Sequence, residues 1–144
     1  MQLLFLTHLA STLVMTGIIW FVQVVHYPLF SRVGAAGFPA YSEAHSHLTT
    51  FVVGPPMIVE AATAVLLVFV RPEDVPDYLV WIGLILLAAV WLSTAALQVP
   101  RHTKLGLGFD PAVWTGLVAT NWVRTAAWSL RAGVVLTMAG YAMK

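Results

Sequence analysis

Two arginines inside the last apolar stretch of this chain constrain its fold more than any other feature. The stretch runs from about Pro111 to Lys144. A helix through it rises about 1.5 Å per residue, which puts Arg131 roughly 20 Å from the C-terminal end and inside a hydrocarbon core about 30 Å thick. Positions at offsets 0, 3, 7 and 10 share one helical face, and here they are Asn121, Arg124, Trp128 and Arg131.

A guanidinium at that depth needs a partner. Charged side chains near the middle of a bilayer cost about 2.5 to 3.5 kcal/mol on insertion scales, and they normally face the interior of a bundle. Glu60 is the one acidic residue in any apolar stretch, so we expect it to pair with Arg131 or Arg124. Two arginines facing one carboxylate leave a positive charge over, which predicts an anionic ligand group. The alternative is that the arginines only join helices or extend outward to the interface.

Composition points to a membrane protein. The chain is 60% hydrophobic and 9% charged, with a mean hydropathy of +0.86, whereas an ordinary soluble domain is about 25% charged. A formal net charge of +1 argues against a nucleic-acid partner, which would require a basic patch. The absence of cysteine excludes disulfides, thiolate metal sites and iron–sulfur clusters. A metal or haem would therefore need histidine, carboxylate or methionine ligands.

The hydropathy pattern predicts an all-α integral membrane protein, a four-helix bundle in which an extra amphipathic helical segment precedes the second helix. One transmembrane domain covers residues 1–144. Such a multi-pass chain has the lipid bilayer as its first partner. The expected spans are residues 3–25, residues 56–70 with a slanted lead-in from residue 39, residues 78–99, and residues 112–143.

Prolines set the expected ends of these helices. We expect His26-Tyr27-Pro28 to close the first helix, Gly54-Pro55-Pro56 to break or kink the second, and residues 100–111 to form a loop. Four spans put both termini on one face. The opposite face, here called the loop end, carries three basic loop residues against two at the termini, which weakly predicts a cytoplasmic loop end.

The topology gathers polar side chains near the loop end, above Glu60 and Arg131. We interpret this as a polar funnel in which Glu60, Arg124 and Arg131 are candidate catalytic residues. Trp128 lies where it could form the wall of a pocket for a flat ring. The candidate cofactor-binding residues are His26, His45, Gln98, Asn121 and Trp128.

Metal and haem are two open interpretations of the histidines. Glu43 and His47, four residues apart on one helical face, can bring two ligands to one metal, with His26 or His102 as a third. Alternatively, His26 with His45 or His47 could ligate haem b, whose propionates would meet the arginines of the last span. Chemistry without a cofactor, and histidines that are simply solvated beside the headgroups, remain the other interpretations.

A family resemblance accompanies this pattern. Gly17, His26-Tyr27-Pro28, Asn121-Trp122-x-Arg124 and Arg131 resemble the small four-helix bacterial membrane proteins of unknown function related to anthrone oxygenases. The resemblance covers most of the chain in topology and a few residues in motif. It implies a bacterial inner-membrane location and an oxygenase or oxidoreductase activity.

We therefore expect a membrane-embedded redox protein that binds an apolar or anionic aromatic ligand, haem or metal between its helices, opened toward the loop end. One alternative is a proton or small-solute transporter, because buried Glu60 and Arg131 are residues that such paths use. Another is a non-catalytic scaffold or accessory subunit. For that role the last span offers a seam of small residues, Ala126, Gly133 and Gly140. We expect this seam to pack on a neighbouring helix or, in a homo-oligomer, on a second copy of the chain.

Overall fold

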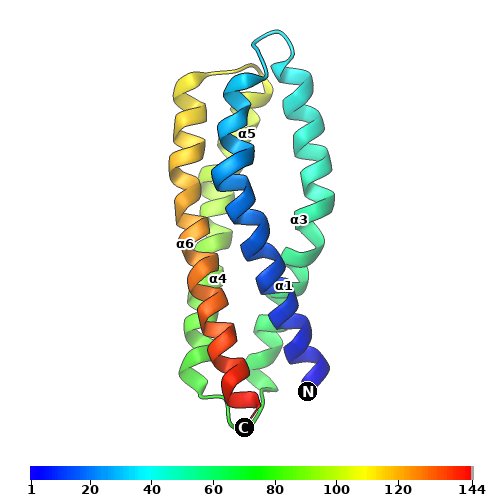
Figure 1. The fold of residues 1–144 in the computed structure, drawn as a ribbon, viewed down its shortest axis with the longest axis vertical. Coiled ribbons are helices and arrows are strands. Elements are labelled where there is room, and N and C mark those ends of the chain that lie inside the picture. The colour runs from blue at the N-terminus through cyan, green and yellow to red at the C-terminus, as the bar shows by residue number, and fades with distance from the viewer. Residues whose placement is uncertain (144) are drawn as a thin grey trace.

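The structure is a computed structural model that describes residues 1–143 of the 144-residue chain. Within those residues it is all-helical and forms four long rods that lie side by side (Figure 1). The first rod joins α1 (Gln2–Phe21), the π-helical turn η1 (Val22–His26), α2 (Tyr27–Leu29) and the 3₁₀ turn η2 (Phe30–Arg32). The second rod is α3 (Phe38–Phe69), and the fourth is α6 (Pro111–Ala142). The third rod joins α4 (Asp77–Ser93), the π-helical turn η3 (Thr94–Gln98) and α5 (Val99–Gly106).

The rods form a four-cornered bundle. α1 and α4 each pack against both α3 and α6, which places α3 and α6 diagonally across from one another. Both termini lie at one end, together with the connection between α3 and α4, as the sequence predicts (Figure 1). A side chain that joins α3 to α6 must therefore cross the middle of the bundle.

Two predicted helix ends are wrong, and for the same physical reason. The first rod continues past His26-Tyr27-Pro28, and the third continues through Pro100 into α5, where we expected a loop. A π-helical turn precedes each proline, and each proline occupies the first turn of the short helix that follows. A proline there needs no amide hydrogen, because the first-turn amides have no partner within that helix.

Of the break or kink expected in the second rod, the break is absent, because α3 runs without interruption through Pro55 and Pro56, and the kink stays a prediction. The slanted lead-in and the span are therefore one helix of 32 residues. Buried side chains on both sides of the prolines, including His45 and Met57, hold the two halves in the bundle. Packing of this kind compensates for the hydrogen bonds that an internal proline removes.

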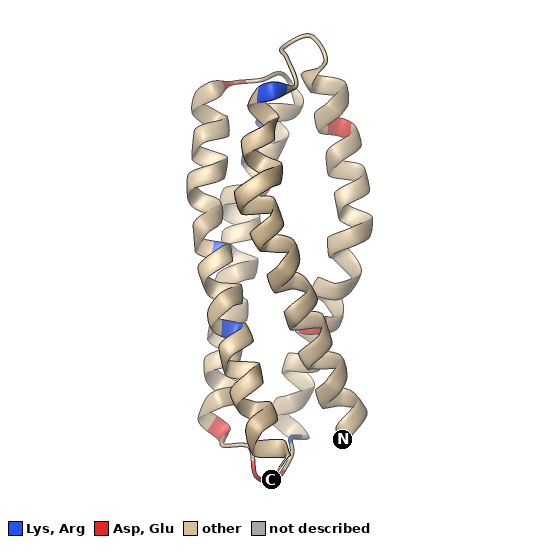
Figure 2. Ribbon diagram, in the orientation of Figure 1, with Lys and Arg blue, Asp and Glu red and all other residues tan. Residues whose placement is uncertain are grey.

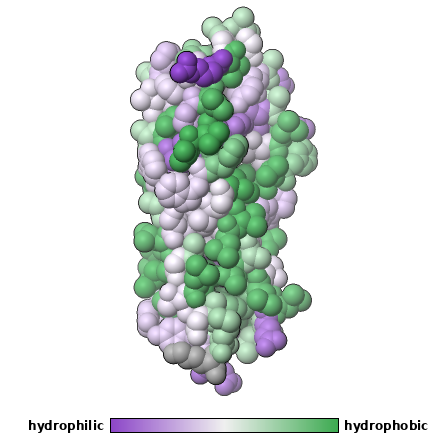
Figure 3. Space-filling view, in the orientation of Figure 1, coloured by the Kyte–Doolittle hydropathy of each residue, from purple (hydrophilic) through white to green (hydrophobic). Residues whose placement is uncertain are grey.

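Three helical segments are long and apolar enough to cross a membrane, namely 2–32, 38–69 and 77–106. The polar residues of α6 lower its hydropathy, but Arg124 and Arg131 are buried inside the bundle. Charged residues are few and lie mainly near the two ends, apart from the buried ones (Figure 2). Apolar side chains spread over the length of the visible face (Figure 3). These features are consistent with a membrane protein, as the composition predicts.

The seam of small residues on α6 faces outward. Ala126, Gly133 and Gly140 are all exposed, and a Cβ atom added to either glycine would have no neighbour within 4 Å. The prediction that this seam packs on a neighbouring helix of the same chain is therefore wrong. The helical face opposite the arginines points away from the bundle, and its packing on a second copy stays a prediction.

Candidate functional site

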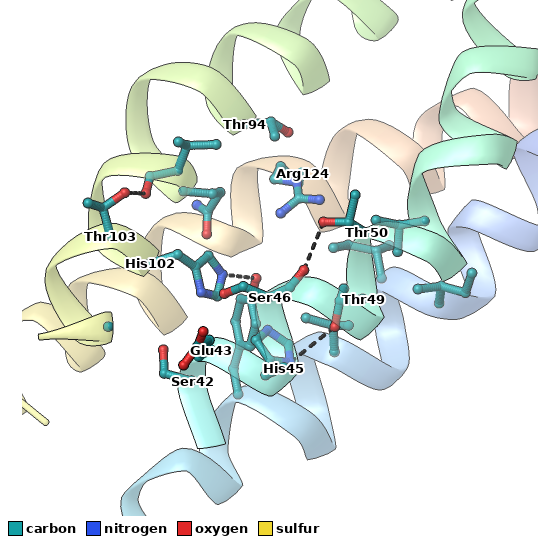
Figure 4. A pocket seen from close by; sticks show the side chains of 18 of the residues that line it. Ser42, Glu43, His45, Ser46, Thr49, Thr50, Thr94, His102, Thr103 and Arg124 are labelled. Atoms are coloured by element: carbon teal, nitrogen blue, oxygen red, sulfur yellow. Dashed lines mark hydrogen bonds between the residues drawn. The ribbon is translucent and has the colours of Figure 1, made fainter. Parts of the chain in front are cut away.

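A large cavity opens between α1, α3, the η3–α5 segment and α6. Its volume is about 790 Å³, within the range of about 300 to 1,000 Å³ that is usual for small-molecule sites. Figure 4 shows Ser42, His45 and His102 at one side of it and Arg124 facing it from α6. The rest of the lining is mainly apolar and includes Met15, Ile18, Ile19, Val22, Val53 and Met57.

Among the residues of 1–143 that line this cavity, Arg124 carries the one buried charge. Its side chain is only 7% exposed. Nη1 donates to the Asn121 side-chain oxygen at 3.4 Å, the guanidinium lies 5.2 Å from the centre of the Trp128 ring, and the Tyr27 hydroxyl lies beside it. Among residues 1–143, Arg124 forms no ion pair, and its Nε makes no hydrogen bond. A buried cation in this state has a strong preference for an anionic partner.

Glu60 does not supply that partner, because both of its carboxylate oxygens are already engaged. Oε1 accepts from Arg131 Nε at 2.9 Å and Oε2 accepts from the Trp128 indole at 3.0 Å. Arg131 also donates Nη1 to the carbonyl of Gly83. The predicted pairing of Glu60 with Arg131 is confirmed, and Arg124 is left out of it.

The Glu60–Arg131 pair forms a floor below the cavity. Glu60, Arg131 and Trp128 are completely buried, and none of them lines the cavity. Trp128 lies between Glu60 on one side and Arg124 on the other. We therefore interpret Glu60 and Arg131 as structural and reserve ligand contact for Arg124.

Three histidines meet at the loop end of the cavity. His26 Nε2 and His45 Nδ1 are 2.8 Å apart, and Thr49 Oγ1 lies 3.1 Å from the same His45 nitrogen. The His45 and His102 rings are stacked with centroids 5.4 Å apart. The Tyr27 hydroxyl is 2.8 Å from His102 Nε2. These contacts form two hydrogen-bonded pairs, His26–His45 and Tyr27–His102, which meet at the stacked rings of His45 and His102.

Several buried polar atoms on the cavity wall make no hydrogen bond within residues 1–143. Buried polar groups normally have partners, so four exceptions among the residues that line one cavity are unusual. One of these atoms is a strong donor, the guanidinium nitrogen of Arg124, and the others are acceptors or neutral donors. The atoms are Ser42 Oγ, Gln98 Oε1, His102 Nδ1 and Arg124 Nε.

Asn121 and Gln98 differ in their roles. Asn121 turns toward the first rod, where its amide donates to Gln23 at 2.9 Å, and it positions Arg124 without lining the cavity. Gln98 lines the cavity and donates its amide to Thr120 at 3.1 Å, and its oxygen makes no hydrogen bond within residues 1–143.

The predicted metal ligands do not converge. Glu43 lines the outer part of the cavity, whereas His47 is exposed and packs on the ring of Phe51. The described residues contain no group of three or more histidines and acids arranged to hold a metal. His26 and His45 approach within 2.8 Å, whereas two nitrogens on opposite sides of a metal stand about 4 Å apart. This geometry fits a hydrogen-bonded pair better than a pair of axial haem ligands.

Sequence reasoning missed Tyr27, Ser42 and the two π-helical turns. A π-helical turn inside an α-helix often marks a functional site. The turn η1 ends on His26, which belongs to the histidine cluster, and η3 ends on Gln98, which lines the cavity. A signal was present in the sequence. In each case a polar residue stands two positions before a proline, as in His26-Tyr27-Pro28 and Gln98-Val99-Pro100.

Comparison with known proteins adds no family to this description. No protein-family model, no curated protein and no solved structure matches the chain. The described residues form a helical bundle with a large, mainly apolar cavity that the buried side chain of Arg124 lines.

Proposed function

We propose that this protein is a membrane-embedded enzyme of the oxidoreductase or oxygenase type that binds an apolar aromatic ligand with an acidic group and removes a proton from it. The observation that carries the proposal is the buried, unpaired guanidinium of Arg124 facing a large cavity whose walls are mainly apolar. The resemblance to the proteins related to anthrone oxygenases points in the same direction. A bacterial inner membrane, with the loop end in the cytoplasm, is the proposed location.

Binding follows from the shape and chemistry of the cavity. Arg124 would hold an ionised oxygen of the ligand, because its side chain lines the cavity and forms no ion pair within residues 1–143. Met15, Ile19 and Met57 would contact the aromatic body. Burying such a ring contributes about 25 cal/mol for each Å² of apolar surface removed from water.

Proton removal follows from the histidine cluster. The His26–His45 pair could take a proton from the ligand, and the Tyr27–His102 pair lies beside it. The resulting ligand anion would be stabilised by Arg124, as preorganised charges stabilise anions in other enzyme sites. An electron-rich anion of this kind would then be open to oxidation by dioxygen, which is soluble in membranes and comes from outside the protein.

A phenol that changes colour on ionisation tests both parts of the proposal, namely binding at Arg124 and proton removal by the histidine cluster. The purified protein in detergent is mixed with 4-nitrophenol at a pH below the pKa of the free phenol. Under these conditions we expect binding to the wild type to increase the absorbance of the phenolate form. Arg124→Gln should weaken binding about tenfold or more, as the loss of a charge-assisted hydrogen bond implies. His45→Phe should reduce the phenolate signal more than the binding. Arg32→Gln, at an exposed arginine, is the matched control. Equal phenolate signals for Arg124→Gln and Arg32→Gln would refute the proposal.

The transport and scaffold alternatives have weaker support. Below the floor formed by Glu60 and Arg131, the next space has a volume of only about 10 Å³, too small for more than one water molecule. Both oxygens of Glu60 are engaged, so a proton path through it would first have to break the ion pair. A scaffold role would leave the buried charge of Arg124 without a purpose.

A further inference from the structure

A second hollow meets the cavity between α1 and α3. This outer groove has a volume of about 400 Å³. It shares four lining residues with the cavity, two from each side of the contact between the rods, so the two spaces adjoin along that contact. The shared residues are Ile18, Val22, Thr49 and Val53.

The outer groove lies on the apolar outside of the bundle. Its walls include Phe21, Leu48 and Val52, which are 57%, 63% and 60% exposed. All three belong to helical segments that are long and apolar enough to cross a membrane. Gly17 lines the groove as well, and a Cβ atom there would have no neighbour within 4 Å. In a bilayer this groove would face hydrocarbon chains and not water.

Arg124 lies at the same depth as the junction between groove and cavity. Gln23, next to Val22 in η1, accepts hydrogen bonds from Asn121 and Thr125 of α6, which flank Arg124 in sequence. A ligand held by Arg124 would therefore have its far side close to the opening between the two rods.

The other end of the cavity suits an apolar chain poorly. Ser42, Glu43 and Ser46 line it from α3, and Thr103 lines it from α5. Glu43 is exposed there, so an anionic head group would also be repelled by its carboxylate. The polar end therefore suits water, whereas the opening between α1 and α3 suits hydrocarbon.

We propose that the ligand is a membrane-soluble amphipath: an acidic aromatic head group that binds at Arg124, and a long alkyl or isoprenoid chain that leaves the cavity between α1 and α3 and lies in the outer groove. This inference rests on the proposed function for the head group and adds the chain and its path. The ligand then reaches the site sideways from the bilayer, with its tail still in contact with lipid.

The groove can be filled without touching the head-group site. Gly17→Phe places a ring in the outer groove, where the backbone has open space, and it replaces glycine with a residue of higher helix propensity. Gly140→Phe is the matched control, because Gly140 is also exposed with open space around it but lies on α6 away from the groove. Val52→Trp blocks the groove from α3 and serves as a second variant should Gly17→Phe fail to fold.

Two probes separate the chain from the head group: salicylate, and salicylate with a dodecyl chain on the ring. Each buried methylene is worth roughly a three- to fourfold gain in affinity, so blocking the groove should weaken binding of the dodecyl compound by about tenfold or more relative to Gly140→Phe. Salicylate should bind all three proteins equally. Comparing variants with the same probe and detergent cancels partition of the probe into micelles.

The outcomes distinguish the two proposals. If both blocking variants bind dodecylsalicylate as tightly as Gly140→Phe, while salicylate binding depends on Arg124, the chain does not use the groove and this inference fails alone. If salicylate and its dodecyl derivative bind no better to the wild type than to Arg124→Gln, the head-group site fails and both proposals are overturned.

Discussion

Trp128 donates its indole hydrogen to Glu60 across 3.0 Å, and this bond joins α6 to α3 across the diagonal of the bundle. The same ring lies 5.2 Å from the Arg124 guanidinium. One aromatic side chain thus separates a neutralised ion pair from an unpaired cation. The floor and the ligand site are built on a single face of α6, with Trp128 as the boundary between them.

The ion pair of the floor should be essential to stability. Glu60→Gln removes the counter-charge of Arg131 and leaves a completely buried guanidinium, which typically costs about 3 to 5 kcal/mol. We expect a large fall in the thermal unfolding midpoint in detergent, measured by circular dichroism. Glu43→Gln, at an exposed acid, is the control and should change little. The double variant Glu60→Gln, Arg131→Met should recover part of the loss, and no recovery would contradict the ion-pair explanation.

Removing the charge of Arg124 should have the opposite effect on stability. Its charge is buried without an ionic partner, so Arg124→Met, which keeps the length and removes the charge, should raise the free energy of unfolding. The same variant should lose affinity for phenolate and carboxylate probes. Such opposed effects on stability and binding are typical of functional sites. Chemical denaturation and probe titration on one preparation would check both, and a destabilised variant would indicate that Arg124 is structural.

The two arginines also show what the sequence could and could not predict. Their shared helical face and the need for Glu60 as a partner follow from spacing and from the scarcity of acids in apolar stretches. Arg124 and Arg131 are seven residues, or about 10 Å, apart along the helix, so only one can be level with Glu60. Which one depends on how α3 and α6 are offset along the bundle, and no local pattern encodes that offset.

The histidine cluster was predictable for a different reason. Topology alone brings His26, His45 and His102 to the loop end, and they do lie together there. Their contacts depend on the π-helical turn η1, which rotates the residues after it relative to a regular α-helix. Assigning residues to helical faces from a period of 3.6 residues per turn therefore gives wrong faces beyond Val22. That method could not predict the bond between Tyr27 and His102.

That bond gives a further prediction. Tyr27→Phe removes the hydroxyl that pairs with His102 Nε2 and should cost about 1 kcal/mol in stability, the usual net value of one hydrogen bond. If the Tyr27–His102 pair takes part in proton transfer, the phenolate absorbance of bound 4-nitrophenol should also fall while its affinity changes little. Tyr41→Phe is a suitable control, because Tyr41 makes ring contacts at the same end without lining the cavity. Identical spectra for both variants would leave His26 and His45 as the only proton carriers.

Asn121 allows the charge of the cavity to be cancelled without removing the arginine. Its side-chain oxygen is 3.4 Å from Arg124 Nη1, so Asn121→Asp places a carboxylate beside the guanidinium. The resulting internal ion pair should compete with any anionic ligand and weaken salicylate binding about tenfold or more. Asn121→Ala loses the bonds to Gln23 and to Arg124 but keeps the unpaired charge, so it should weaken salicylate binding less than Asn121→Asp does. Equal affinities for the two variants, measured by titration under the same conditions, would mean that charge at Arg124 does not select the ligand.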